Sequence, residues 1–65
     1  MLFIVYSKGI GEGRARRVCI TRSMQSADTA ATLEAIKAST EEVRVVAHDG
    51  DVTEVSYYKS AEAAP

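Results

Sequence analysis

The sequence contains no tryptophan, one proline, one cysteine and one histidine, and these shortages exclude several classes of structure. Cys19 has no second cysteine to bond with, so the chain cannot form an internal disulfide. Cys19 and His48 together are too few ligands for a structural zinc. No segment approaches the ~20 consecutive apolar residues of a membrane helix. Apolar residues 1–6 have no basic region before them and no cleavage site after them, which argues against a secretory signal. We therefore expect a soluble, cytoplasmic protein.

A chain of 65 residues is long enough for one domain only. Chains of this size bury only about 60% of the surface that the unfolded chain exposes, so the core is small. Good packing and self-association are the expected supports, and the chain is either a monomer or a homodimer. The sequence pattern predicts one compact domain over residues 1–59 and a disordered tail over residues 60–65.

The order of apolar and turn-forming residues predicts strand, strand, helix, strand, strand. The predicted strands are residues 2–7, 17–23, 43–48 and 52–58, and the predicted helix is residues 27–38. This order indicates an α+β fold, with a single-layer, four-stranded and mainly antiparallel sheet and one helix on one face. If the first strand pairs with the last, the arrangement resembles the β-grasp fold.

The helix and the second hairpin carry the clearest local signals. Ser26 or Asp28 is expected to cap the helix N-terminus, and Leu33 and Ile36 are expected to face the sheet beside Ala30. The dipeptide at positions 49–50, Asp-Gly, predicts a type I′ hairpin turn.

The first strand is apolar at every position from 2 to 6, so the sequence leaves open which side chains face the helix. If Leu2, Ile4 and Tyr6 face it, Phe3 and Val5 lie on the other side of the sheet. A single helix covers one sheet face, and the other face then marks a dimer or partner contact. The alternative is that sheet twist and the glycine-rich loop shield these side chains.

Charge is divided unevenly along the chain. Residues 1–22 contain five basic residues and one acidic residue, whereas residues 23–65 contain three basic and eight acidic residues. The acidic residues predict a negative, partner-binding face that imitates the phosphates of DNA. Its expected members are Glu34, Glu41, Glu42, Asp49, Asp51 and Glu54. The alternative is an ordinary solubilising surface.

The basic residues suggest a second kind of site. Arg14, Arg16 and Arg17 could contact nucleic-acid phosphates, which makes a small nucleic-acid-binding accessory protein one alternative function. The other alternative is a homodimeric scaffold that packs through the open sheet face. No zinc finger, helix-turn-helix or aromatic RNA-binding signature accompanies these residues. The preceding glycines at 9, 11 and 13 lead into a strand, so they do not match a phosphate-binding loop, which leads into a helix.

Candidate catalytic and metal-binding residues are few. A Cys19–His48 pair is conceivable, but a small sheet with one helix leaves little volume for a water-excluding pocket. Asp49 and Asp51 around a glycine fall short of a calcium loop. The sequence predicts no enzyme activity, no catalytic residues, no cofactor and no metal.

In its size, acidic leaning and ββαββ order, the whole chain resembles the small inhibitors of phages and mobile elements, most of all anti-CRISPR proteins that act on type I systems. The resemblance implies a stoichiometric inhibitor that docks on a host protein or ribonucleoprotein complex and blocks its nucleic-acid binding. It does not indicate which residues make the contact, and direct binding of nucleic acid is the less favoured alternative.

Overall fold

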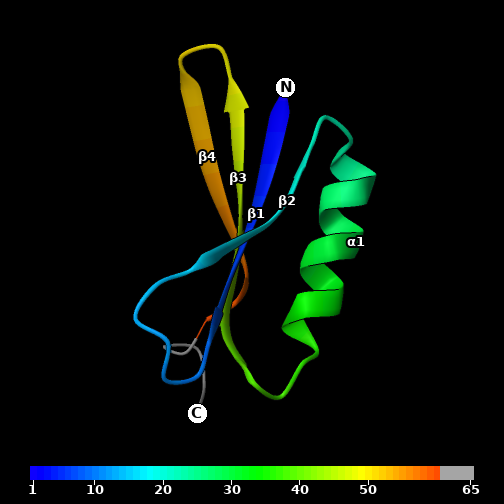
Figure 1. The fold of residues 1–65 in the computed structure, drawn as a ribbon. Coiled ribbons are helices and arrows are strands. Elements are labelled where there is room, and N and C mark those ends of the chain that lie inside the picture. The colour runs from blue at the N-terminus through cyan, green and yellow to red at the C-terminus, as the bar shows by residue number, and fades with distance from the viewer. Residues whose placement is uncertain (61–65) are drawn as a thin grey trace.

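A computed structural model describes residues 1–60 and confirms the α+β class and the ββαββ order (Figure 1). The expected tail at 60–65 lies outside the described residues, except for Ser60, which belongs to no helix or strand. The five elements are β1 (Leu2–Gly9), β2 (Arg16–Thr21), α1 (Met24–Ala35), β3 (Thr40–Asp49) and β4 (Val52–Lys59). Each strand therefore begins and ends within a few residues of the expected position.

The four strands form one sheet in the order β2-β1-β3-β4, and every neighbouring pair is antiparallel. The β-grasp alternative is not adopted, because β1 pairs with β3 rather than with β4. The β1–β3 ladder runs from Leu2 opposite His48 to Gly9 opposite Thr40, which is the full length of β1. An antiparallel ladder of this length replaces the parallel pairing of first and last strands, which is slightly less stable per residue.

Alternate residues of β1 face α1. Phe3, Val5 and Ser7 are buried on that side, while Leu2, Ile4 and Tyr6 are half-buried on the other. This is the reverse of the arrangement in which Leu2, Ile4 and Tyr6 face the helix. A shift of one residue in strand register exchanges the two faces, so an apolar strand cannot fix its own orientation.

The helix starts earlier than expected and buries a different face. Its N-cap is Ser23, whose hydroxyl accepts a hydrogen bond of 3.2 Å from the amide of Ser26, so the Ser26 or Asp28 cap was wrong. Leu33 and Ile36 are 56% and 75% exposed, so their predicted burial was also wrong.

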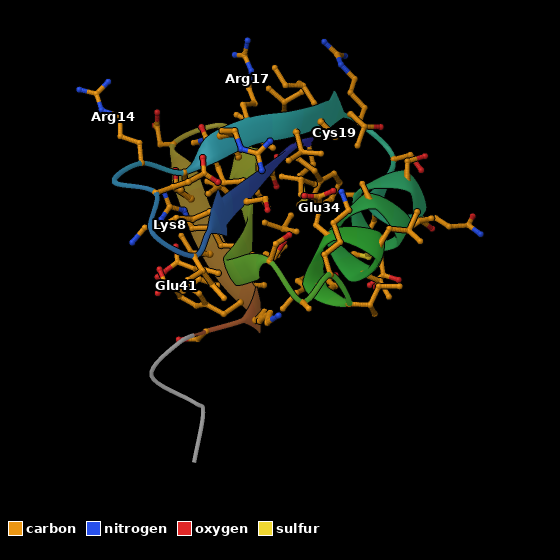
Figure 2. All side chains as sticks on the ribbon, turned by 60° about the horizontal axis from the view of Figure 1, so that its bottom comes forward. Lys8, Arg14, Arg17, Cys19, Glu34 and Glu41 are labelled. Atoms are coloured by element: carbon orange, nitrogen blue, oxygen red, sulfur yellow. The ribbon has the colours of Figure 1, made fainter. Side chains whose placement is uncertain are left out.

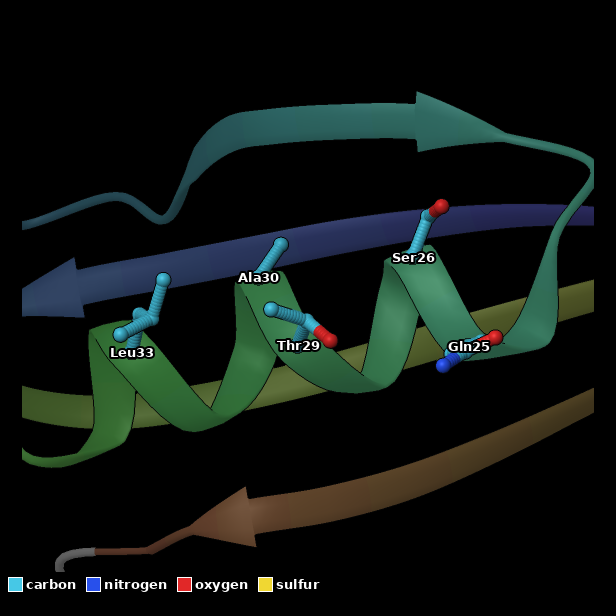
Figure 3. Close-up of a pocket in the computed structure, with 5 residues that line it drawn as sticks. All are labelled: Gln25, Ser26, Thr29, Ala30 and Leu33. Atoms are coloured by element: carbon cyan, nitrogen blue, oxygen red, sulfur yellow. The ribbon is translucent and has the colours of Figure 1, made fainter.

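The residues of α1 that face the sheet are Ala27, Ala31 and Glu34. The two alanines let the helix backbone approach Val5 and Val43 closely, an approach that larger side chains would prevent. With Phe3 and Val45, these four residues form the buried core. α1 lies over β1 and β3 and contacts β4 least (Figure 3).

The β3–β4 turn also differs in detail from the expected type I′ turn. Asp49 pairs with Val52, so the two central turn residues are Gly50 and Asp51. Of these two residues, only Gly50 has a positive φ, which is +61°. Within residues 1–60, positive φ values occur at glycine only. A positive φ at the first central position alone is the pattern of a type II′ turn, which equally suits a two-residue hairpin.

The buried face of α1 can be tested by exchanging its small and large residues. Ala31→Leu should lower the free energy of unfolding by about 1–3 kcal/mol, because the added methyl groups overpack the contact with the sheet. Leu33→Ala should change it by less than about 0.5 kcal/mol, because Leu33 is exposed. Urea denaturation followed by circular dichroism measures both. The opposite ranking would contradict the assigned face.

Candidate functional site

The structure separates the acidic residues that the sequence analysis grouped together. Glu41 and Asp49 lie near opposite ends of β3, about 26 Å apart along the strand at ~3.3 Å per residue. Glu41 forms an ion pair with Lys8 (3.2 Å), and Glu42 forms one with Arg44 (3.1 Å). The six carboxylates therefore do not form one negative face.

Glu34 lies between α1 and the sheet (Figure 2) and is only 9% exposed. Its carboxylate accepts a hydrogen bond from the ammonium group of Lys37, and this bond is the main cause that lowers the pKa of Glu34 below its ordinary value of 4.5. Burial acts in the opposite direction. The hydroxyl of Ser7 also lowers the pKa, although its buried Oγ forms no hydrogen bond of regular geometry. Glu34 therefore supports the helix–sheet contact and is not accessible to a partner.

Three of the expected acidic residues, Asp49, Asp51 and Glu54, remain together at the β3–β4 hairpin. All three are exposed, and none forms an ion pair within residues 1–60. They lie within five residues of each other in the sequence, on both sides of a two-residue turn. The hairpin is therefore the part of the chain where unpaired negative charge collects.

A groove runs beside this hairpin on the sheet face that carries α1, because the helix leaves the inner side of β4 uncovered. Its volume is about 300 Å³, and a smaller hollow of about 110 Å³ continues it towards the turn. Both hollows are lined by Met1, Ala47 and Glu54. The larger one is also lined by Phe3, Met24, Val45, Ser56 and Tyr58, and the smaller one by Asp49 and Val52. We call the two hollows together the hairpin groove.

The far end of β4 is fastened to the helix. The Tyr58 hydroxyl donates a hydrogen bond of 2.7 Å to Asp28, and the Lys59 ammonium donates one of 3.0 Å to the carbonyl oxygen of Lys37. The bond to Asp28 is the main cause that raises the pKa of Tyr58. These bonds therefore close the hairpin groove at the end near Tyr58, and the unpaired carboxylates lie at the opposite end, near the β3–β4 turn.

The outer edge of β4 is the second feature of this region. β4 is an edge strand of eight residues, and no described strand pairs with its outer side. The other edge strand, β2, is shorter, with six residues, and each edge strand has one register shift against its inner neighbour. Strand edges of this kind accept a further strand from another chain.

Sequence reasoning missed most of the groove lining. Met24 precedes the helix that the pattern predicted, and Tyr58 and Ser56 reach the groove only because of the β3–β4 register. The alternation of β4 was a usable signal, since Glu54, Ser56 and Tyr58 are spaced two apart and share one face.

The basic residues do not converge. Arg14 lies in the β1–β2 loop, whereas Arg17 lies on β2 as the cross-strand neighbour of Tyr6. Figure 2 shows the two side chains projecting from separate places. Arg16 forms an ion pair with Glu12 at 3.5 Å. Glu12 also accepts a 2.8 Å hydrogen bond from the amide of Gly9, so a carboxylate occupies the glycine-rich loop.

Cys19 and His48 lie on opposite faces of the sheet. Cys19 is opposite Val5 and packs against the core, whereas His48 is opposite Leu2 and its Nδ1 lies 3.1 Å from the hydroxyl of Thr53. The two side chains therefore form no pair. Within residues 1–60, no group of three or more His, Cys, Asp or Glu side chains is placed to hold a metal ion.

A further hollow, with a volume of about 440 Å³, lies along α1 (Figure 3). It is lined by Gln25, Ser26, Thr29, Ala30 and Leu33. None of these side chains is charged or titratable, so this hollow contributes no chemistry.

Comparison with protein-family models, with curated proteins and with solved structures finds no match to this chain. In the described part of the chain, no helix has both the length and the apolar character needed to cross a bilayer.

The Glu34–Lys37 contact generates a prediction about acid stability. A carboxyl group with a lowered pKa in the folded state stabilises the fold above its unfolded-state pKa, and this contribution is lost as the pH falls through the folded-state value. Glu34→Gln should therefore lower the free energy of unfolding at pH 7 by about 1 kcal/mol, a small value because Lys37 is half exposed. Below the folded-state pKa the difference should shrink. Urea denaturation at pH 7 and at acid pH measures this, and a difference that does not change with pH would contradict the assignment.

Proposed function

We propose that the chain is a non-catalytic protein-binding domain that docks on a basic, extended segment of a partner protein through the β3–β4 hairpin. One observation carries the proposal: the unpaired carboxylates of Asp49, Asp51 and Glu54 adjoin both an apolar groove and a free strand edge. The strand edge fits the backbone of a protein segment, the groove fits its apolar side chains, and the carboxylates fit its basic side chains.

The free edge of β4 offers backbone donors and acceptors to an added strand, which gives affinity without selecting side chains. The hairpin groove selects, because alternate side chains of an added strand point towards the same sheet face as the groove. Met1 and Met24 line it with flexible, polarisable side chains that adapt to different apolar groups. The carboxylates then favour lysine or arginine near the turn. The preferred segment is therefore extended and alternates apolar with polar residues, and it is basic at one end.

This docking mode is compatible with a stoichiometric inhibitor of a host nucleic-acid-binding complex. Protein surfaces that hold nucleic acid are rich in lysine and arginine, so an acidic hairpin docked on such a surface competes with phosphate. In this proposal three carboxylates of one hairpin make the contact, rather than a DNA-mimicking face of six. Glu34, Glu41 and Glu42 have their own cationic partners within the chain.

The proposal is tested with charge reversals at the two ends of β3. The triple variant Asp49→Lys, Asp51→Lys and Glu54→Lys should bind the partner captured from a host lysate at least about tenfold more weakly than the unmodified chain. The control is Glu41→Lys with Glu42→Lys, two charge reversals against three, which should bind within about threefold, because these side chains lie at the other end of β3. Titration by calorimetry measures both.

Circular dichroism establishes that each variant is folded before the titrations are compared. Equal losses in the hairpin variant and the control would show that net charge, not the hairpin, determines binding. An unchanged affinity of the folded hairpin variant, or capture of no protein by the unmodified chain, would contradict the proposal.

The alternative function, nucleic-acid contact through Arg14, Arg16 and Arg17, has less support because Arg16 is paired and the other two side chains diverge. We expect no salt-dependent binding of duplex or single-stranded DNA in a fluorescence-anisotropy titration at low ionic strength. Binding that weakens steeply with added salt and disappears in the Arg14→Ala, Arg17→Ala variant would replace the hairpin proposal with this alternative.

A further inference from the structure

The sheet face opposite α1 carries apolar side chains from all four strands. We call it the open face. Its apolar and aromatic members are Leu2, Ile4, Tyr6, Val18, Ile20, Val46, Val55 and Tyr57. Four of these are strongly exposed, with Val18 at 41%, Ile20 at 48%, Val55 at 47% and Tyr57 at 61%.

Strand register orders these side chains into rows that cross the sheet. Ile20, Ile4, Val46 and Val55 lie opposite one another in the order β2-β1-β3-β4 and form an uninterrupted apolar row. The neighbouring row alternates cation and aromatic ring. Its members, in the same order, are Arg17, Tyr6, Arg44 and Tyr57.

The interior of the chain is small compared with this surface. Among residues 1–60, the largest fully buried side chains are Val5, Val43 and Ser7, and Phe3 is the one buried aromatic residue. Larger apolar side chains lie on the open face than in the core. Domains of this size have small cores and marginal stability, and covering the open face would bury more apolar surface.

We propose that the open face is the interface of a two-fold symmetric homodimer, with a second copy of the chain as its occupant. The face spans four strands about 4.8 Å apart and eight residues of about 3.3 Å each, or roughly 500 Å² per copy. Two apposed faces therefore bury about 1,000 Å² in total, which reaches the lower limit for a specific interface. Sheets packed in this way form a two-layer sandwich.

The alternating row determines how the two copies are related. A two-fold axis that runs along the strands, between β1 and β3, reverses the row order from one copy to the other. Arg17 then lies over Tyr57 of the partner subunit, and Tyr6 lies over the partner's Arg44. Every arginine meets an aromatic ring, which is a favourable cation–π arrangement. The apolar rows meet each other in the same operation.

Within one chain, one of the two arginines in this row already has a cation–π contact. The Arg44 guanidinium carbon lies 5.1 Å from the centre of the Tyr6 ring, and Glu42 balances its charge. Arg17 and Tyr57 lie at the two ends of the row, too far apart to meet within one copy, and Arg17 has no ion-pair partner among residues 1–60. The second copy supplies each of them with its complement.

Sedimentation equilibrium and light scattering of the full chain, at concentrations up to about 1 mM, test the dimer. The expected mass is that of two chains. Val55→Lys should give a folded monomer, because it places a charge in the apolar row of both copies. Leu33→Lys is the matched control, since Leu33 is exposed to a similar degree, 56% against 47% for Val55, but lies on α1. It should leave the mass unchanged.

A second pair of variants tests the row. Arg17→Ala and Tyr57→Ala should each weaken the dimer at least about threefold, and together they should cost less than the product of the two separate effects, because both remove the same contact. A monomeric wild-type chain, a dimer that resists Val55→Lys, or an assembly larger than a dimer would overturn the proposal.

This interface does not depend on the proposed function. The hairpin groove lies on the α1 side of the sheet, and the open face lies on the other. The triple hairpin variant should therefore remain dimeric. Loss of partner binding by a dimer and loss of the dimer by a chain that still binds its partner are separate outcomes.

Discussion

A single helix of 12 residues provides the whole second layer for a sheet of four strands, and most features of this molecule follow from that limit. The helix approaches β1 and β3 closely because it presents Ala27 and Ala31 to them. A close approach gives a dense core but a narrow one. β4 is left beyond the edge of the helix, which creates the hairpin groove, and no helix or strand within residues 1–60 covers the opposite sheet face.

The narrow core also explains why a charged residue lies at the helix–sheet contact. Glu34 follows Ala27 and Ala31 on the buried side of α1, where a third apolar residue is the usual choice. Its carboxylate is kept ionised by Lys37, whose ammonium group stays half exposed at the margin. The ion pair thus lies at the margin of the buried core, beside the partly buried Ala35. Carboxylates with such a local role are lost to partner recognition.

The sequence pattern was sufficient for the element order, because turn residues and apolar periodicity are local properties. It failed wherever the answer depended on register. The apolar sequence of β1 is equally compatible with Phe3 or Ile4 facing the helix. The orientation is determined by the pairing of β1 with β3. The acidic residues were grouped on the expectation that the helix end and the last two strands lie close together, yet β3 separates Glu41 from Asp49 by nearly its whole length. Leu33 was assigned to the core by hydrophobicity, although the helix positions that face the sheet are those of Ala27, Ala31 and Glu34.

The proposed dimer connects the two surfaces that the single helix leaves free. An axis along the strands keeps β3 and β4 of both copies pointing in the same direction, so the two hairpins project from the same end. Three carboxylates from each chain then lie at that end, while Arg14 of both copies lies in the β1–β2 loop at the other. A partner with two basic segments could engage both hairpins at once, and the second contact would benefit from a high effective concentration. Pairing of two chains thereby brings six hairpin carboxylates to one end of the dimer, where a single chain has three. The two hairpins then repel each other, and salt reduces this repulsion.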